Sequence, residues 1–237
     1  MNSFDRVKLL LGEENYIKLK NSTVAIFGIG GVGGFTAEAL CRSGVGNIIL
    51  IDSDTVDESN INRQIIATKE SVGKDKVSVM KERLLSINPN ANIVTHKIFY
   101  LSENADAVSF DGVSYVVDAI DTVSAKIEII ERAKKANIPV ITCMGMGGKL
   151  DPTALKVGCV EKTSGCPLAR VMRRELKKRN LFNVKAVYSE ESVSYNQSEE
   201  QLKADGKKAP PSMIFVPATA GLLLAREVVL DIIKEKL

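Results

Sequence analysis

The feature that most constrains the fold of this chain is a glycine-rich segment, Gly28-Ile29-Gly30-Gly31-Val32-Gly33, between a predicted strand at 24–27 and a predicted helix at about 32–41. Glycine in such a turn lets the backbone approach a phosphate, and the first amides of the following helix face the anion. Nineteen residues after Gly33 the next predicted strand has ended and Asp52 stands where it can accept hydrogen bonds from ribose hydroxyls. This context predicts a nucleotide-binding unit of Rossmann type.

Apolar strand-like runs alternate with amphipathic segments of helix length over the first two-thirds of the chain, which predicts a parallel sheet with helices on both faces. The predicted strands there are 24–27, 47–51, 92–96, 114–117 and 139–142, and the predicted helices are about 32–41, 74–86 and 124–136. Later segments predict strands at 154–160 and 184–188 and helices at about 167–179 and 219–234. We expect an α/β protein whose Rossmann-like sheet is parallel in the first half and extended by antiparallel strands in the second.

The length of 237 residues fits one domain, 1–237, with a nucleotide-binding half at 1–150 and a specificity half at 151–237. A polar stretch at about 196–212 predicts a mobile surface loop. The net charge of +3 is too small to indicate a nucleic-acid partner by itself. No C-x-x-C pair, no signal peptide and no apolar run long enough for a membrane span are present, so we expect a cytoplasmic protein with reduced thiols.

Polar side chains follow several of the predicted strands. Because ligands of open α/β sheets bind beyond the carboxyl ends of the strands, we expect these side chains to converge near the glycine-rich segment. The set consists of Asp52, Asp54, Asn60, Arg63, Lys76, Asp118 and Asp121. Arginine and lysine there would stabilise charge on the α-phosphate and the leaving pyrophosphate, and an aspartate would hold Mg²⁺. This composition indicates a nucleoside triphosphate with Mg²⁺.

A nicotinamide-dependent dehydrogenase is the alternative that the glycine-rich segment suggests first. The chain lacks the groups for hydride-transfer chemistry, since its only histidine, His96, lies inside a predicted strand. The single Tyr-x-x-x-Lys pattern, Tyr16 to Lys20, precedes the first strand. A Walker A motif is absent as well, because Gly73-Lys74 is followed by Asp75. The residues therefore favour activation of a substrate by ATP.

Five short segments around this predicted site form a recognisable pattern. They are GIGGVG at 28–33, LIDSDTV at 50–56, SNINRQ at 59–64, VGKDK at 72–76 and DAID at 118–121. Together they resemble the ubiquitin-activating E1-like superfamily, the HesA/MoeB/ThiF group. The resemblance implies an ATP site made of Gly28, Gly30, Gly31, Gly33, Asp52, Asp54, Asn60, Arg63 and Lys76. It implies that Asp52 holds ribose, that Asn60, Arg63 and Lys76 contact phosphates, and that Asp121 binds Mg²⁺. It further implies a homodimer in which Arg6 of one subunit reaches the ATP of the other.

The second half separates branches of this superfamily. Sulfur-carrier activators in it usually carry two C-x-x-C pairs for a structural zinc, whereas the cysteines here stand at 41, 143, 159 and 166, so we expect no zinc. The segments MGMGGKLDP at 144–152, PLARVMRREL at 167–176 and FVPATAG at 215–221 instead resemble the tRNA threonylcarbamoyladenosine dehydratase family. That resemblance implies ATP-dependent dehydration of N6-threonylcarbamoyladenosine at position 37 of tRNA, through adenylation of its carboxylate. The alternatives are activation of the C-terminal Gly-Gly of a ubiquitin-like sulfur-carrier protein and a non-catalytic nucleotide-sensing module.

The predicted helix at 167–179 carries its cations on one face, at Arg170, Arg173, Arg174, Lys177 and Lys178. In a nearly neutral protein such a face is typical of a polyanion contact, so we expect it to bind tRNA. A solvated charged face and a docking site for an acidic carrier protein are the alternatives.

Cys166 precedes this helix, whose N-terminus lowers thiol pKa values, but an inert role is favoured over that of an acyl acceptor. A sulfur-transfer partner, and a monovalent cation (K⁺ or Na⁺) near the glycines at 145–148, are left open.

Overall fold

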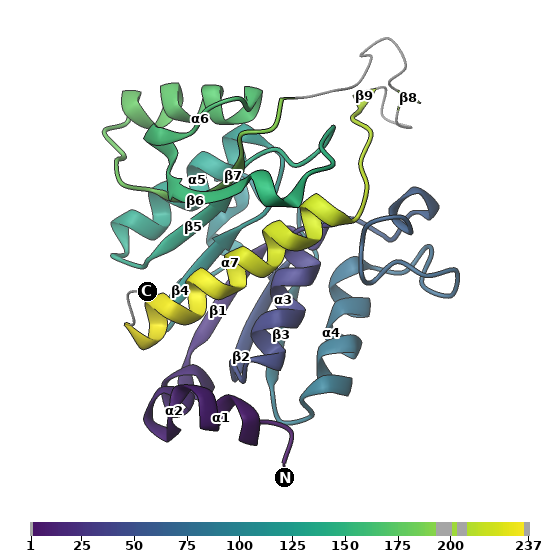
Figure 1. Cartoon of the computed structure of the whole chain (residues 1–237), viewed down its shortest axis with the longest axis vertical. Helices are drawn as coiled ribbons and strands as arrows, with labels where there is room; N and C mark the ends of the chain where they lie inside the picture. The colour runs from purple at the N-terminus through teal and green to yellow at the C-terminus, as the bar shows by residue number, and fades with distance from the viewer. Residues whose placement is uncertain (1, 193–200, 203–207, 235–237) are drawn as a thin grey trace.

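A computed structural model describes residues 2–192, 201–202 and 208–234, and its centre is a seven-stranded sheet (Figure 1). The strand order is β3-β2-β1-β4-β5-β7-β6. The strands are β1 Thr23–Phe27, β2 Asn47–Ile51, β3 Asn92–His96, β4 Tyr115–Asp118, β5 Val140–Cys143, β6 Leu155–Cys159 and β7 Lys185–Ser189. The order reverses between β1 and β4, which is the point where sheets of this kind bind ligands.

Seven α-helices surround the sheet in the part of the chain that is described. They are α1 Asp5–Leu11, α2 Glu13–Asn21, α3 Gly33–Arg42, α4 Lys76–Ile87, α5 Val123–Lys135, α6 Pro167–Lys178 and α7 Phe215–Ile233. Short 3₁₀ turns join them, among them Glu58–Asn60 and Ser102–Ala107. The strands and helices predicted from the sequence are confirmed, most bounds to within one or two residues.

Successive side chains of the central strands are buried on opposite faces of the sheet. In β1, Val24 and Ile26 belong to the apolar cluster formed with α3, α4 and α7, while Ala25 and Phe27 belong to the cluster formed with α5 and α6. A parallel strand covered on both faces needs such a continuous apolar run, and the inner strands β1, β2, β4 and β5 each have one. The predicted α/β sheet with helices on both faces is confirmed.

The extension of the sheet differs from the prediction in one strand. β6 pairs antiparallel with β7, as expected, but β7 pairs parallel with β5 through Ile141 and Lys185. β7 lies inside the sheet with four of its five residues buried, whereas β6 forms the edge and is mostly half-buried. Cys159 at the end of β6 pairs with Lys185 at the start of β7, so α6 returns the chain to the same end of the sheet, and local sequence does not specify that β7 then enters between β5 and β6.

Helices α1 and α2 were not predicted. Leu19 is the only residue that they bury, so they lack the apolar periodicity that marks a helix in sequence. They lie at the end of the sheet where β1 begins (Figure 1). There α2 covers the loop after α3, where a Cβ on Gly46 would stand 1.9 Å from the Lys20 carbonyl oxygen.

The polar stretch at 196–212 lies largely outside the described residues. Within it the structure describes β8 Gln201–Leu202 and β9 Lys208–Ala209, which pair antiparallel, and residues 210–212. Among the described helices, none has the length and apolar character needed to cross a lipid bilayer.

Candidate functional site

The glycine-rich segment forms a tight turn at the reversal point of the sheet. Gly28 has a φ of +88°, and a Cβ there would stand 2.7 Å from the carbonyl oxygen of Ala119 after β4. A Cβ on Gly33 would stand 1.8 Å from the Gly28 carbonyl oxygen, so any side chain would break the turn. Beside Gly30 the nearest atom lies 3.9 Å from an added Cβ, which leaves room against the backbone. The segment is therefore closed toward the sheet and open toward a ligand.

Asp52 binds the glycine-rich segment directly. Its Oδ2 accepts a hydrogen bond from the Ile29 amide at 2.6 Å, and its Oδ1 accepts one from the Asp54 amide at 2.8 Å. Each carboxylate oxygen can accept a second hydrogen bond, so ribose hydroxyls remain possible partners. Besides the ribose contact predicted from its spacing, Asp52 therefore positions the glycine-rich segment.

Lys76 begins α4 and faces the same loop. Its Nζ lies 2.7 Å from Asp54 Oδ2, and its side chain is 7% exposed against 62% for that of Asp54. The Lys76 amide also donates to the Asp54 carbonyl oxygen at 3.0 Å. Together with the two hydrogen bonds of Asp52, these contacts link α4 to the glycine-rich segment. A cation is held at this point in a nearly dehydrated position, where its interaction with an anion is strengthened.

Asn60 and Arg63 lie in the loop after β2. The Asn60 Oδ1 accepts from the Asp57 amide at 3.2 Å, which caps the turn Glu58–Asn60. The Arg63 Nη1 donates to the Ser59 carbonyl oxygen at 2.8 Å and to Asn62 Oδ1 at 2.9 Å. A Cβ added to Gly31 would stand 3.5 Å from Arg63 Cγ, so the arginine lies against the glycine-rich segment.

Gln64 is a site residue to which the sequence analysis assigned no role, although it lies in the recognised segment 59–64. It is 7% exposed, and its Oε1 is the one buried side-chain polar atom without a hydrogen-bond partner among the described residues. Its Nε2 is the atom nearest to an added Cβ on Gly30. A buried acceptor without a partner is costly, so a donor on a ligand or on an ordered water is expected here.

The turn that carries Asp121 is held by a buried ion pair. Lys126 Nζ lies 2.9 Å from Asp118 Oδ2, and both side chains are 0% exposed. Lys126 also donates to the Ile120 carbonyl oxygen at 2.9 Å, and Thr142 Oγ1 donates to Asp118 Oδ2 at 2.6 Å. Asp118 is therefore occupied within the core, whereas Asp121 is exposed at the same edge of the sheet. Of the two aspartates, only Asp121 is available to a ligand.

Arg6 lies away from these residues. It belongs to α1, near the end of the sheet where β1 begins, whereas the glycine-rich segment follows the end of β1 (Figure 1). The structure therefore brings together the predicted residues of the nucleotide site with the exception of Arg6.

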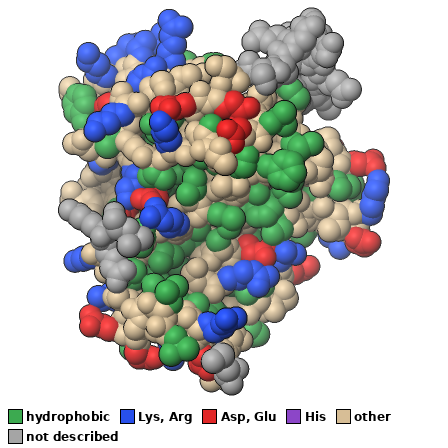
Figure 2. Space-filling view, in the orientation of Figure 1, with side chains coloured by type: hydrophobic (Ala, Val, Ile, Leu, Met, Phe, Trp, Pro, Cys, Tyr) green, Lys and Arg blue, Asp and Glu red, His purple; other side chains and the backbone are tan. Residues whose placement is uncertain are grey.

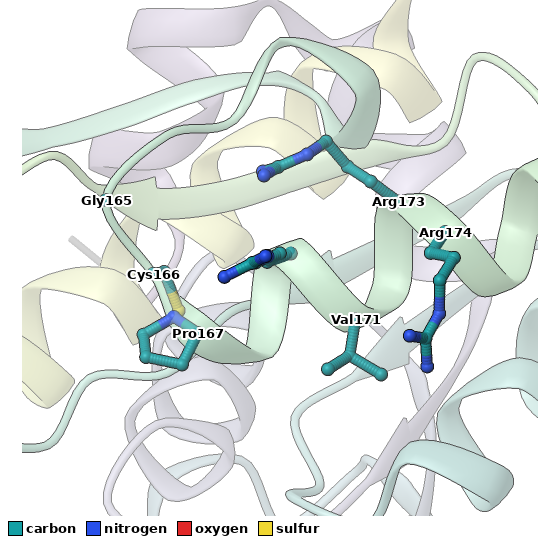
Figure 3. Close-up of a pocket in the computed structure, with 7 residues that line it drawn as sticks. Gly165, Cys166, Pro167, Val171, Arg173 and Arg174 are labelled. Atoms are coloured by element: carbon teal, nitrogen blue, oxygen red, sulfur yellow. The ribbon is translucent and has the colours of Figure 1, made fainter.

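The basic helix α6 is amphipathic, as predicted. Ala169, Met172 and Leu176 are buried, and Arg170, Arg174, Lys177 and Lys178 are exposed. Arg173 instead turns toward the core edge, where its Nη1 donates to the Thr163 carbonyl oxygen at 2.6 Å and to Thr163 Oγ1 at 2.8 Å. Blue side chains gather at the top left of Figure 2, over α6. The start of the helix borders a hollow of about 730 Å³, where Arg173 and Arg174 leave the helix in different directions (Figure 3).

Glu175 interrupts this basic face without neutralising it. Hydrogen bonds from Arg179, Lys178 and Arg174 lower the pKa of Glu175 to about 2. One carboxylate thus binds three cations, and Arg179 adds to the predicted set. The surface keeps an excess of positive charge and has its side chains partly ordered by Glu175.

The cysteines do not form a metal centre in the part of the chain described. No cluster of three or more histidine, cysteine, aspartate or glutamate side chains there could hold a metal ion. Burial raises the pKa of the Cys41 thiol to about 11 and that of the Cys143 thiol to about 12. Cys166 is 5% exposed at the start of α6, and its Sγ lies 3.3 Å from the position of an added Cβ on Gly145. This burial favours the inert role expected for it.

Comparison with known proteins identifies the class that this fold and site define. The ThiF family profile matches residues 4–235, and the chain therefore belongs to the ThiF family.

Two relatives and one solved structure are similar over most of the chain. The tRNA threonylcarbamoyladenosine dehydratase of Bacillus subtilis (strain 168) is 41% identical over 244 residues, covering 99% of this chain and 96% of the relative. The enzyme of that name from Escherichia coli (strain K12) is 38% identical over 198 residues, covering 80% of this chain and 74% of the relative. A crystal structure of the E. coli tRNA N6-threonylcarbamoyladenosine dehydratase in complex with ATP has a TM-score of 0.88 and 34% identity, covering 98% of this chain and 94% of that one. The similarity extends through both halves.

Proposed function

We propose that this chain is an ATP-dependent dehydratase of N6-threonylcarbamoyladenosine in tRNA. The observation that carries the proposal is the convergence of Arg63, Lys76 and Asp121 around an open glycine-rich turn. Hydride-transfer enzymes have no need of two cations and an exposed aspartate at that place. The relatives matched over most of the chain are dehydratases, and this favours tRNA over a ubiquitin-like carrier protein as the substrate.

The nucleotide would lie across the ends of β1 and β4. Amides after Gly28 and the start of α3 would receive the phosphates, because helix N-termini bind anions. Asp52 would hold the ribose, while Asn60, Arg63 and Lys76 would contact the phosphate oxygens. Two features fit this ligand. Gln64 Oε1 is a buried acceptor without a hydrogen-bond partner among the described residues, and the backbone at Gly30 has open space beside it.

Adenylation follows from this placement. A carboxylate oxygen of the threonylcarbamoyl group attacks the α-phosphorus of ATP, and pyrophosphate leaves with the electron pair of the broken P–O bond. The ureido group of the same substituent then attacks the activated carbonyl carbon and loses a proton to solvent. AMP leaves with the electron pair of the broken C–O bond and carries away the oxygen that the carboxylate lost. Arg63 and Lys76 would stabilise the negative charge that develops on the phosphates in the first step.

Asp121 is the residue that we expect to hold Mg²⁺. It lies exposed on the turn fixed by the Asp118–Lys126 pair. A magnesium ion usually takes only one or two protein carboxylates and completes its shell with phosphate oxygens and water, which fits a lone exposed aspartate. When bound, the ion would neutralise phosphate charge.

The basic face of α6 would bind the tRNA backbone. Arg170, Arg174, Lys177 and Lys178 are exposed there and can contact phosphates, whereas Arg173 is held by Thr163. Contacts of this kind position a nucleic acid without reading its sequence.

Arg6 would serve the nucleotide site of a second copy in a homodimer. Its helix α1 has no buried residue, and Leu9 and Leu10 are 77% and 82% exposed, which favours a partner surface over them. Arg6→Ala and Arg63→Ala homodimers should each be inactive. When equal amounts of the two variants exchange subunits, half of the dimers contain one subunit of each variant, and each such dimer has one intact site of two. The mixture should therefore recover roughly a quarter of the wild-type activity. Absence of recovery in dimers shown to exchange subunits would refute the shared site.

Release of AMP tests the adenylation step. With ATP, Mg²⁺ and tRNA that carries the threonylcarbamoyl group, the wild-type protein should release AMP, and Arg63→Ala and Asp121→Ala should lower the rate by about 10²-fold or more. Lys135→Ala is the matched control, since Lys135 is an exposed cation in the last turn of α5, paired with Glu131. Equal rates in all three variants would contradict the proposed site.

A further inference from the structure

Lys149 is a buried cation for which the described chain provides no counter-charge. Three lysines are buried among the described residues: Lys76, Lys126 and Lys149. Lys76 is paired with Asp54 and Lys126 with Asp118. Lys149 is 3% exposed, has no carboxylate within 4.0 Å in the described part of the chain, and makes one hydrogen bond there, to the Gly145 carbonyl oxygen at 3.2 Å. A buried ammonium without an anion is unfavourable, so its presence points to a ligand.

The loop that carries Lys149 is held in place from both sides. A Cβ on Gly147 would stand 2.9 Å from Pro210 Cγ, and the Gly148 amide donates to the Pro211 carbonyl oxygen at 2.7 Å. After the loop, the Glu191 carboxylate accepts from the Leu150 and Asp151 amides at 2.9 Å each. These contacts fix the backbone of the loop independently of the Lys149 side chain, so the ammonium is not needed to hold the loop, and the described residues place no opposite charge beside it.

The position of the loop connects the two parts of the proposed site. It follows β5, whose Thr142 pairs with Asp118 of β4, so it leaves the sheet beside the turn that carries Asp121. On its other side, Gly145 lies against Cys166 Sγ, which borders the hollow at the start of α6 (Figure 3). The loop therefore lies between the turn that carries Asp121 and the start of the basic helix, and the Lys149 ammonium donates to its Gly145 carbonyl oxygen.

We propose that the Lys149 ammonium binds the carboxylate of the threonylcarbamoyl group and presents it to ATP. This inference rests on the proposed function and adds the residue that recognises the reacting group. An ammonium donates up to three hydrogen bonds, and the Gly145 carbonyl oxygen uses one, so two remain for the two carboxylate oxygens. Within the site Lys149 acts on the acyl substrate, whereas Arg63 and Lys76 act on ATP.

Binding of tRNA without ATP tests this assignment apart from catalysis. The wild-type protein should bind an anticodon stem-loop with the threonylcarbamoyl group about ten- to hundredfold more tightly than the same stem-loop without it, the effect of one charge-assisted hydrogen-bonded pair. Lys149→Met should remove this preference and leave the affinity for the unmodified stem-loop and for ATP unchanged. Lys134→Met is the control, because within the described residues the Lys134 ammonium likewise donates to a single carbonyl oxygen, that of Asn183, but on the protein surface.

A modified ligand gives a second test that needs no variant. If the threonine carboxylate of the stem-loop is converted to its methyl ester, the wild-type affinity should fall by the same factor as in Lys149→Met. A preference that survives in Lys149→Met, or a wild-type protein indifferent to the ester, would overturn the assignment. Weaker ATP binding by Lys149→Met would overturn it too, since the cation would then face phosphate. Failure of the proposed function looks different, because no water would then be lost from the nucleoside even with wild-type protein.

Discussion

The buried pair Asp118–Lys126 allows a quantitative prediction of stability. Replacing Lys126 by methionine would leave the Asp118 carboxylate 0% exposed and without its cation, while the hydrogen bond from Thr142 at 2.6 Å persists. Removing one partner of a buried pair costs about 3–5 kcal/mol, and the retained hydrogen bond places the expected loss at the lower end, about 3 kcal/mol. That is a large share of a total free energy of unfolding of about 5–15 kcal/mol.

Equilibrium unfolding in urea, followed by circular dichroism, measures this loss. With a slope of about 3 kcal/mol per molar urea, the midpoint of Lys126→Met should fall by about 1 M. Asp118→Asn should lose a similar amount, because it leaves the Lys126 ammonium buried without a counter-charge, although the Ile120 carbonyl oxygen still accepts its hydrogen bond. The double variant buries neither charge, so its loss should be smaller than the sum of the single losses by about 2 kcal/mol.

Two results would refute this reasoning. A loss below about 1 kcal/mol in Lys126→Met would mean that the carboxylate finds water or another partner without the lysine. Additive losses in the double variant would mean that the two side chains stabilise the turn separately, and that the turn carrying Asp121 does not depend on their pairing.

Three further predictions concern other parts of the molecule. Burial raises the pKa of Glu38, but hydrogen bonds from Arg83 and Arg42 outweigh burial, and the pKa is lowered. The ionised Glu38 therefore stabilises the fold above the ordinary carboxyl pKa, and this stabilisation is lost as the pH falls through the lowered pKa. In acid unfolding titrations, Glu38→Gln should lose less stability than the wild type over this pH range. Thiol-modifying reagents should react rapidly with Cys159 alone among the four cysteines of the folded protein, since the other three are buried, and mass spectrometry of the peptides identifies the site. Arg174→Ala should weaken tRNA binding whether or not the tRNA is modified and reduce the slope of log affinity against log salt by about 1, as measured by filter binding at several salt concentrations.

Much of the fold follows from local sequence. β2 and β3 have the predicted bounds. β2 is apolar and largely buried, as an inner parallel strand must be, whereas β3 forms an edge of the sheet and buries only Ile93 among its five residues. The glycine-rich segment is placed by the same logic, since only glycine allows the φ of Gly28 and the contact between Gly28 and Gly33. The direction of β7 and the existence of α1 and α2 were missed. The first depends on the insertion of β7 between β5 and β6, and the second on packing that buries one leucine.

The candidate site shows the same division. Predicted residues such as Asp52 and Arg63 lie beside the glycine-rich segment, because strand ends of a parallel sheet meet at one edge. Lys126 and Lys149 were not predicted, since a lysine in a sequence gives no sign that its charge will be buried. Gln64 stood within a recognised segment, yet its unpaired acceptor becomes visible only once the surrounding packing is known.

Mass spectrometry of the modified nucleoside tests the central proposal most directly. The protein would be incubated with ATP, Mg²⁺ and tRNA that carries N6-threonylcarbamoyladenosine, and the tRNA then digested to nucleosides. The proposed function predicts that the modified nucleoside loses the mass of one water, and that omission of ATP or the Arg63→Ala substitution abolishes this loss. An unchanged nucleoside after incubation with folded protein that binds ATP would contradict it.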